Sequence, residues 1–248
     1  MGLRQDYMLS ILDGNDLNPL LQNYWMVIHP PVLFMGFAST IIPFAFVIAG
    51  LWKKNFGEWT KPALPWALFS AAVFGIGIMM GAMWAYESLT FGGYWAWDPV
   101  ENASLVPWLI LISGIHTLLI YKHTGHSLRF GFVLYSTFLT RSGILGETSV
   151  HAFTDLGMNM QLLIFLLMFV LPALVLFIYR YKEIPTIHKE ESTSSREFWM
   201  FIGSLVFFLS ALVIIGKTSI PVVNKILGTK IAPPEKAEFS YNQIMVFI

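Results

Sequence analysis

The sequence contains no cysteine and little charge. Only 12% of its 248 residues are Asp, Glu, Lys or Arg, roughly half the share of a typical soluble domain, and 56% are hydrophobic. Without cysteine, disulfides, thiolate metal sites and thiol nucleophiles are excluded within this chain. Because so few charges cannot coat a water-soluble globule, and because disorder needs more charge and less hydrophobicity, both classes are excluded.

The charges that are present also balance. Fifteen basic residues match fifteen acidic ones, so no net field attracts phosphate, and nucleic acid is not expected as a partner. The mean hydropathy is +0.63. These properties predict an all-α, polytopic membrane helix bundle that contacts membrane lipid.

Runs of about 20 apolar residues, the length of a membrane-spanning helix, occur about six times. They are residues 31–51, 63–85, 104–121, 130–145, 160–179 and 198–216, with Pro43, Pro107 and Pro172 inside them. The sequence ends in residues 240–248, SYNQIMVFI, which we interpret as the start of another apolar run. We therefore expect a single membrane domain over 1–248, truncated at both ends, as a fragment or the product of a split gene.

The distribution of Lys and Arg predicts which side each loop faces. Loops 52–62, 122–129 and 180–197 carry three, two and four basic residues, whereas loop 86–103 has none and loop 141–159 has only Arg141. Short basic loops stay in the cytoplasm. The N-terminal segment and loops 86–103 and 141–159 are then expected on the outer side.

Loop 86–103 and its flanks are rich in aromatic residues. Six crowd into 14 positions: Trp84, Tyr86, Phe91, Tyr94, Trp95 and Trp97. One interpretation is a belt of aromatic rings at the headgroup level. The other is a broad apolar surface for a large planar ligand, which Gly92 and Gly93 favour because glycine permits sharp turns and close approach. The following Asp98-Pro99-Val100-Glu101 predicts a helix start, with Asp98 as N-cap, and this role is compatible with a second one at the site.

Two histidines are predicted on the same outer side as the aromatic residues. His29 lies in Ile-His-Pro-Pro and His151 in Ser-Val-His-Ala-Phe. A histidine in such a place commonly makes only a polar contact, but imidazole is also a common axial ligand of haem iron. Zinc is less favoured, because no third or fourth ligand stands at a suitable spacing.

Two further ionisable residues fall within predicted spans. His116 lies 18 residues after Asp98, about 27 Å deeper at 1.5 Å per residue. Ionisable groups inside membranes are candidates for function, although a hydrogen bond to a neighbouring helix is the alternative. Arg141 needs an anionic partner, such as a haem propionate or Glu147.

Several motifs together resemble one family. Residues 92–109, GGYWAWDPVENASLVPWL, resemble the tryptophan-rich WWD signature of haem-handling proteins of cytochrome c maturation, and we place this haem segment at about 84–104. The blocks DLNPLLQ and IHPP (within 16–31), TFLTRSG (137–143) and SVHAF (149–153) are similar to CcmF, the haem lyase subunit of the system I pathway, or to NrfE. The chain departs from that pattern at Phe91 and Ala96, where larger aromatics are expected.

The resemblance implies the roles of individual residues. His29 and His151 would ligate a haem b at the outer face, beside Trp84, Tyr94, Trp95, Trp97, Asp98 and Arg141, and His116 would be one ligand of a second, intramembrane haem. The family attaches haem to apocytochrome c at a CxxCH motif. It works with a CcmE-like haem chaperone and a CcmH-like partner that handles the apocytochrome, in the bacterial cytoplasmic membrane with the haem site facing the periplasm. No residue is expected to act as a catalytic acid or base.

Three alternatives remain at this stage. The chain could deliver haem without ligating it, as CcmC-type or system II proteins do. It could be a b-type electron-transfer subunit, although only His116 lies mid-span. A small-molecule transporter is the third, and the sequence lacks the paired broken helices with buried charges that would favour it.

Overall fold

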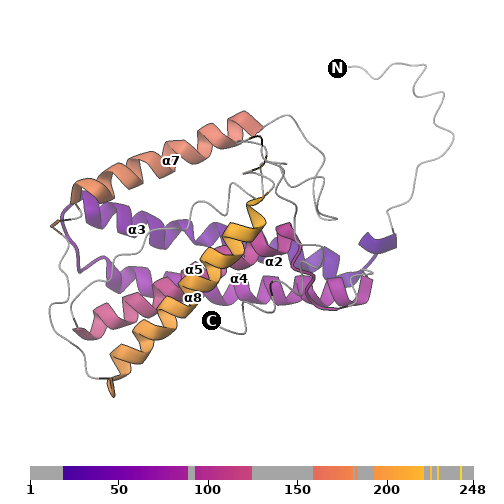
Figure 1. The fold of residues 1–248 in the computed structure, drawn as a ribbon, viewed down its shortest axis with the longest axis horizontal. Coiled ribbons are helices and arrows are strands. Elements are labelled where there is room, and N and C mark those ends of the chain that lie inside the picture. The colour runs from indigo at the N-terminus through magenta and orange to yellow at the C-terminus, as the bar shows by residue number, and fades with distance from the viewer. Residues whose placement is uncertain are drawn as a thin grey trace.

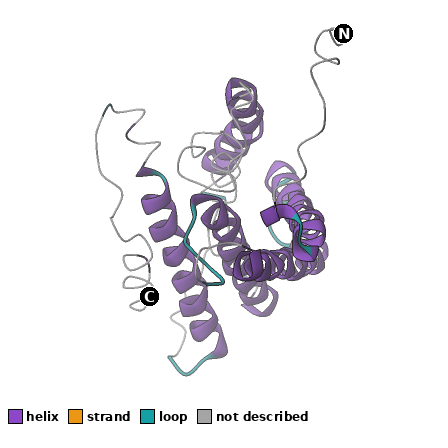
Figure 2. Cartoon of the chain, turned by 90° about the vertical axis from the view of Figure 1, so that its right-hand side faces the viewer, coloured by secondary structure: helices purple, strands orange, loops and turns teal. Residues whose placement is uncertain are grey.

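The computed structural model describes residues 19–88, 93–124, 159–180, 182–183, 193–220 and the single residues 224, 228 and 241. Within these ranges every regular element is helical, as Figure 2 shows. The elements are η1 (Pro19–Leu21), α2 (Tyr24–Ser39), α3 (Ile41–Trp52), α4 (Thr60–Ser88), α5 (Pro99–Thr124), α7 (Asn159–Arg180) and α8 (Arg196–Thr218). The predicted all-α class is confirmed.

Four stretches are long and apolar enough to cross a membrane. They are Tyr24–Trp52 (α2 with α3), Thr60–Ser88, Pro99–His123 and Arg196–Thr218, and they correspond to the first, second, third and sixth predicted spans. The fifth prediction coincides with α7, of which Leu167–Arg180 forms a shorter apolar helix. The fourth, 130–145, lies outside the described residues.

The first span starts earlier than the sequence pattern suggested. We expected it at residue 31, but α2 begins at Tyr24, where the Asn23 side chain caps the helix by accepting a hydrogen bond from the Trp25 amide at 2.8 Å. Pro30 and Pro31 therefore lie inside a helix. Pro43 sits in the first turn of α3 and cannot donate to the carbonyl of Ser39, which explains why the helix breaks at Thr40.

Helix α4 is the centre of the bundle and contacts α2, α3 and α5 (Figure 1). Helix α8 packs along α5, and α7 lies beside α3. The buried cluster between α5 and α8 contains Val106, Leu109, Ile110, Ala211 and Ile214, together with Tyr241. A second cluster joins α4 to α5 through Ala67, Ala71, Leu111 and Ile115.

The distribution of polar and apolar side chains is that of a membrane protein. Small hydroxyl residues are fully or almost fully buried between helices, as at Ser70, Ser113 and Ser204, whereas large apolar side chains such as Val27 and Met79 point outward. Lipid tails accommodate exposed apolar side chains, and small residues allow helices to approach closely. Together with the four apolar helices, this pattern supports a multi-pass membrane protein.

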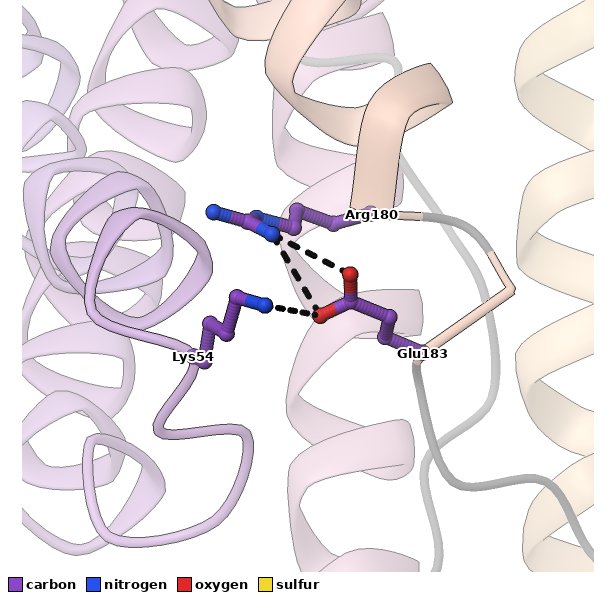
Figure 3. Close-up of polar contacts among 3 residues, drawn as sticks. All are labelled: Lys54, Arg180 and Glu183. Atoms are coloured by element: carbon purple, nitrogen blue, oxygen red, sulfur yellow. Dashed lines mark hydrogen bonds and ion pairs between the residues drawn. The ribbon is translucent and has the colours of Figure 1, made fainter.

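The basic ends of several helices gather at one end of the bundle. Lys54 after α3 contacts Glu183 after α7 at 3.3 Å, and Arg180 contacts the same carboxylate at 3.1 Å (Figure 3). The loop between α3 and α4 also meets α5 there, because Gly57 lies against the Tyr121 hydroxyl. The aromatic segment precedes α5 and is therefore at the opposite end.

Candidate functional site

His29 is held between α2 and α4. Its Nδ1 lies 2.7 Å from the carbonyl oxygen of Gly77, and its ring stacks on the indole of Trp84 with centroids 6.5 Å apart and planes inclined by 21°. Trp84 is 6% exposed, so it is a buried packing partner of His29. The His29 ring lies against Gly81, which is seven residues before the end of α4. The ring is therefore about 10 Å below that end at 1.5 Å per residue.

Sequence reasoning placed Trp84 beside His29 but did not identify the glycines of α4 that contact it. Gly77 and Gly81 contact Leu33 and His29, and they are spaced four residues apart. That Gly-x-x-x-Gly spacing in an apolar helix is the signal that could have found them, because it favours close helix packing in membranes.

The aromatic residues expected to form one broad surface are divided into separate pairs. Tyr86 and Tyr94 stack with centroids 4.2 Å apart and planes at 4°, whereas Trp95 and Trp97 meet edge to face at 87°. The described rings therefore do not share one plane. Tyr86 and Tyr94 are 55% and 51% exposed, so their pair offers accessible ring surface. Phe91 lies outside the described residues.

Trp97 has an unusual backbone conformation. Its φ is +56°, in the left-handed region that a bulky side chain rarely adopts and that costs about 1–3 kcal/mol. Its ring stacks on Tyr241 with centroids 4.9 Å apart, and its carbonyl accepts a hydrogen bond from Asn102 Nδ2 at 3.0 Å. These contacts hold the segment in its strained form just before α5 begins.

The predicted start of α5 is confirmed. Asp98 Oδ1 accepts from the Val100 amide at 2.8 Å, and Glu101 Oε2 accepts from the amides of Asp98 and Ala96 at 3.2 and 3.0 Å. This reciprocal pattern is a capping box, extended by the bond to Ala96. Both carboxylates are thus engaged in fixing the aromatic segment to the helix.

Asn102 lies directly below this cap and is 1% exposed. Its Nδ2 donates to Trp97 O and also to Thr218 Oγ1 of α8, at 3.2 Å. Thr218 in turn lies 3.1 Å from the Tyr241 hydroxyl. The buried network therefore links the aromatic segment, α5 and α8, and sequence reasoning did not assign this role to Asn102.

His116 belongs to a different part of the bundle, deeper along α5. Its Nδ1 lies 2.8 Å from the carbonyl oxygen of Ile112 on its own helix, and its ring is 5.6 Å from that of Phe207 on α8. A Cβ on Gly203 would lie 3.7 Å from His116 Nε2, so this nitrogen faces a glycine on α8. His151 and Arg141 lie outside the described residues, and their distance from His29 is not part of the described structure.

Comparison with known proteins gives these residues a context. Residues 8–145 match the family described as "Cytochrome C assembly protein". The chain belongs to this cytochrome c assembly family. Its relatives include the cytochrome c-type biogenesis protein CcmF of Pseudomonas aeruginosa, 39% identical over 239 residues, which cover 90% of this chain and 36% of that protein.

Other relatives agree. CcmF of Escherichia coli is 35% identical over 88% of this chain and 35% of its own length, and NrfE of Haemophilus influenzae is 39% identical over 65% of this chain and 27% of its own. A solved structure titled "Cytochrome c Heme Lyase CcmF" matches with a TM-score of 0.64 and 28% identity, covering 90% of this chain and 34% of the other. The chain spans about a third of the length of these CcmF proteins, and the resemblance to CcmF and NrfE is confirmed.

Proposed function

We propose that this assembly protein binds haem at the outer face of the membrane and presents it for covalent attachment to apocytochrome c. His29 and His151 supply the axial ligands of the iron. Tyr86 and Tyr94 provide accessible ring surface near the porphyrin, and the segment containing Trp95, Trp97 and Asp98 shapes the adjoining wall. Arg141 pairs with a haem propionate.

One observation carries the proposal. The imidazole of His29 and the aromatic pairs lie at the same end of the bundle, because Trp84 stacks on His29 and Tyr86 stacks on Tyr94. No Lys or Arg occurs between Lys61 and Lys122, so this region has no basic side chain to grip lipid headgroups. An imidazole beside aromatic rings matches the needs of a planar iron porphyrin better than those of a headgroup belt.

The bond-forming chemistry requires little acid–base help from the chain. A thiol of the partner's CxxCH motif adds across a haem vinyl group: the sulfur bonds to one vinyl carbon, and the thiol hydrogen goes to the other. Atoms balance without an oxidant. The nucleophile must come from the partner, since this chain has no cysteine. This chain contributes by orienting the haem, and orientation can lower a reaction barrier by a large amount.

His116 fits a second haem, held within the membrane. Its Nδ1 lies against the Ile112 carbonyl, and its Nε2 faces Gly203 on α8, which has no side chain. A bound haem b would supply the electron that keeps the substrate iron ferrous. His116 offers one ligand, and no residue of this sequence matches the second ligand that the resemblance implies.

The partners and location follow the same proposal. Apocytochrome c is the acceptor, a CcmE-like chaperone delivers haem, and a CcmH-like protein presents the reduced thiols. The basic end that includes Lys54 and Arg180 faces the cytoplasm, and the aromatic end faces the periplasm across the bacterial cytoplasmic membrane.

The test is spectral. The protein, expressed from its native locus and purified in detergent, should carry haem b by pyridine haemochrome with a bis-imidazole low-spin spectrum. The double variant His29→Ala, His151→Ala should lose the outer haem and lower cytochrome c yield at least ten-fold, whereas His116→Ala should lose only the intramembrane haem. His123→Ala, an exposed histidine at the basic end, is the matched control.

Two results would contradict the proposal in different ways. Retention of the outer haem and of cytochrome c yield by the double variant would refute the ligand assignment. Bound haem without any role in cytochrome c formation would favour the delivery function, in which haem passes to another protein.

A further inference from the structure

Gly81 lies directly under the ring of His29. A Cβ placed on Gly81 would come within 2.6 Å of His29 Cε1 and 3.0 Å of both ring nitrogens. Gly77, Gly81 and Trp84 follow one another at four and three residues, so all three lie on one face of α4. On that face, His29 contacts the carbonyl of Gly77, the backbone at Gly81 and the indole of Trp84.

The contact with Gly77 also decides where the proton of His29 resides. A backbone carbonyl only accepts hydrogen bonds, so the 2.7 Å contact requires that Nδ1 carries the hydrogen and donates it. In the neutral ring, Nε2 then carries the lone pair that a metal needs. A carbonyl on the remote nitrogen also raises the basicity of a ligating imidazole.

We propose that Gly81, acting with the Gly77 carbonyl, is a positioning residue that sets the ring plane and tautomer of His29 for axial coordination of haem iron. This inference rests on the proposed function and adds the residues that orient the His29 imidazole. Gly81 touches neither iron nor porphyrin. It acts by letting the imidazole lie flat against the backbone of α4, where the Gly77 carbonyl can reach Nδ1.

Gly81 differs from the other glycines of this helix pair. A Cβ on Gly77 would meet the backbone of Leu33, and one on Gly36 would meet the backbone of Phe74, so both hold helices together. A Cβ on Gly81 would meet only the His29 ring within its three nearest contacts. The first atoms that an alanine at this position meets are therefore those of the His29 ring, not the backbone of α2.

The variant to make is Gly81→Ala in the protein from its native locus. Gly114→Ala is the matched control, because Gly114 is also helical and a Cβ added there would meet nothing within 4 Å. Readouts are the low-spin spectrum of the outer haem, its rate of loss to apomyoglobin, and thermal stability. We expect Gly81→Ala to retain haem about 10- to 100-fold more weakly than Gly114→Ala, the range found when a group supporting a metal ligand is lost. Added imidazole should restore its low-spin spectrum.

The double variant His29→Ala, Gly81→Ala separates positioning from folding. If Gly81 acts only through the His29 ring, Gly81→Ala costs no stability once the ring is absent, so the double variant is as stable as His29→Ala alone. A double variant less stable than His29→Ala would overturn the proposal. The proposal would also be overturned if Gly81→Ala matched the Gly114→Ala control in spectrum and haem retention while His29→Ala lost haem. In that case the proposed function would still stand.

Discussion

Two helix pairs of this bundle are joined by different means. Between α2 and α4, glycines bring backbones into contact, since Cβ atoms on Gly36 and Gly77 would collide with the main chain of the opposite helix. Between α5 and α8, side chains bond across the interface: Ser113 Oγ donates to Ser204 O at 2.9 Å, and Ser204 Oγ donates to Ser113 O at 3.2 Å.

The difference indicates how each pair tolerates change. A backbone contact at a glycine does not tolerate a larger residue, because any added atom must push the two helices apart. A hydroxyl contact can be lost with a modest cost, since interhelical hydrogen bonds in membranes average about 0.6 kcal/mol. The helix that carries His29 is thus held mainly by close backbone contact, to which hydrogen bonds of His29 to Gly77 and of Ser39 to Ser70 add. The helix that carries His116 is held by hydrogen bonds and by the apolar cluster around Ile214.

The largest effect should come from Gly77→Ala. Its Cβ would lie 2.6 Å from the Leu33 Cα, and overpacking against backbone should cost about 3 kcal/mol. Unfolding in a mixed-detergent titration measures this. Gly114→Ala should be neutral or stabilising by up to about 1 kcal/mol through helix propensity. Equal stability of the two variants would show that α2 and α4 can separate freely.

A smaller loss is expected from Asn102→Leu. This change removes the hydrogen bonds to Trp97 O and Thr218 Oγ1. The Trp97 carbonyl then lacks this donor, and the free energy of unfolding should fall by about 2 kcal/mol. It should also release the left-handed backbone of Trp97, visible as a shift in tryptophan fluorescence. Ser104→Ala, which loses only a local bond to Glu101 O, is the control. An unshifted spectrum would assign the conformation of Trp97 to the stacking on Tyr241 alone.

The smallest effect belongs to the ion pairs of Glu183, of which the one with Lys54 joins the end of α3 to the end of α7. Desolvation raises the pKa of Glu183, but hydrogen bonds and charge attraction from Lys54 and Arg180 outweigh it, so this pKa lies below its usual value of 4.5. A depressed pKa stabilises the fold above the unfolded value, and that contribution disappears as pH falls through the folded value.

Glu183→Gln should therefore match the wild type at pH 3 and be slightly less stable at pH 7, with the difference reduced by salt. Melting temperatures at both pH values, with and without 0.5 M salt as an approximate screening condition, provide the measurement. Glu58→Gln, on the same end of the bundle, is a suitable control. A difference as large as that of Asn102→Leu would contradict the ranking.

Local signals were read correctly from the sequence, and contacts between distant residues were not. The Asp98 cap was predicted because its partners lie within three residues. The Asn23 cap was missed because the apolar run begins later and two prolines argue against an earlier helix start. The partners of His29 come from a helix 48 residues away, which periodicity alone does not reveal.

The aromatic segment illustrates the same limit. Its composition singled out residues 84–97, but composition carries no information on the angles between rings. Trp95 and Trp97 are perpendicular because Asn102 and Tyr241 fix the main chain and the ring of Trp97, and one of these residues is 144 positions further along the chain. Three-dimensional packing decided the shape of this site.

The stacked tyrosines have a practical consequence. Because the rings of Tyr86 and Tyr94 stack 4.2 Å apart, this contact joins the end of α4 to the segment before α5, on either side of the stretch between the two tyrosines. The entropic cost of closing a loop grows slowly with its length, by about 0.6 kcal/mol for each doubling. An epitope or a protease recognition sequence inserted there should leave the flanking helices in register, and antibody or protease access from one side would report the sidedness of the aromatic end in intact cells.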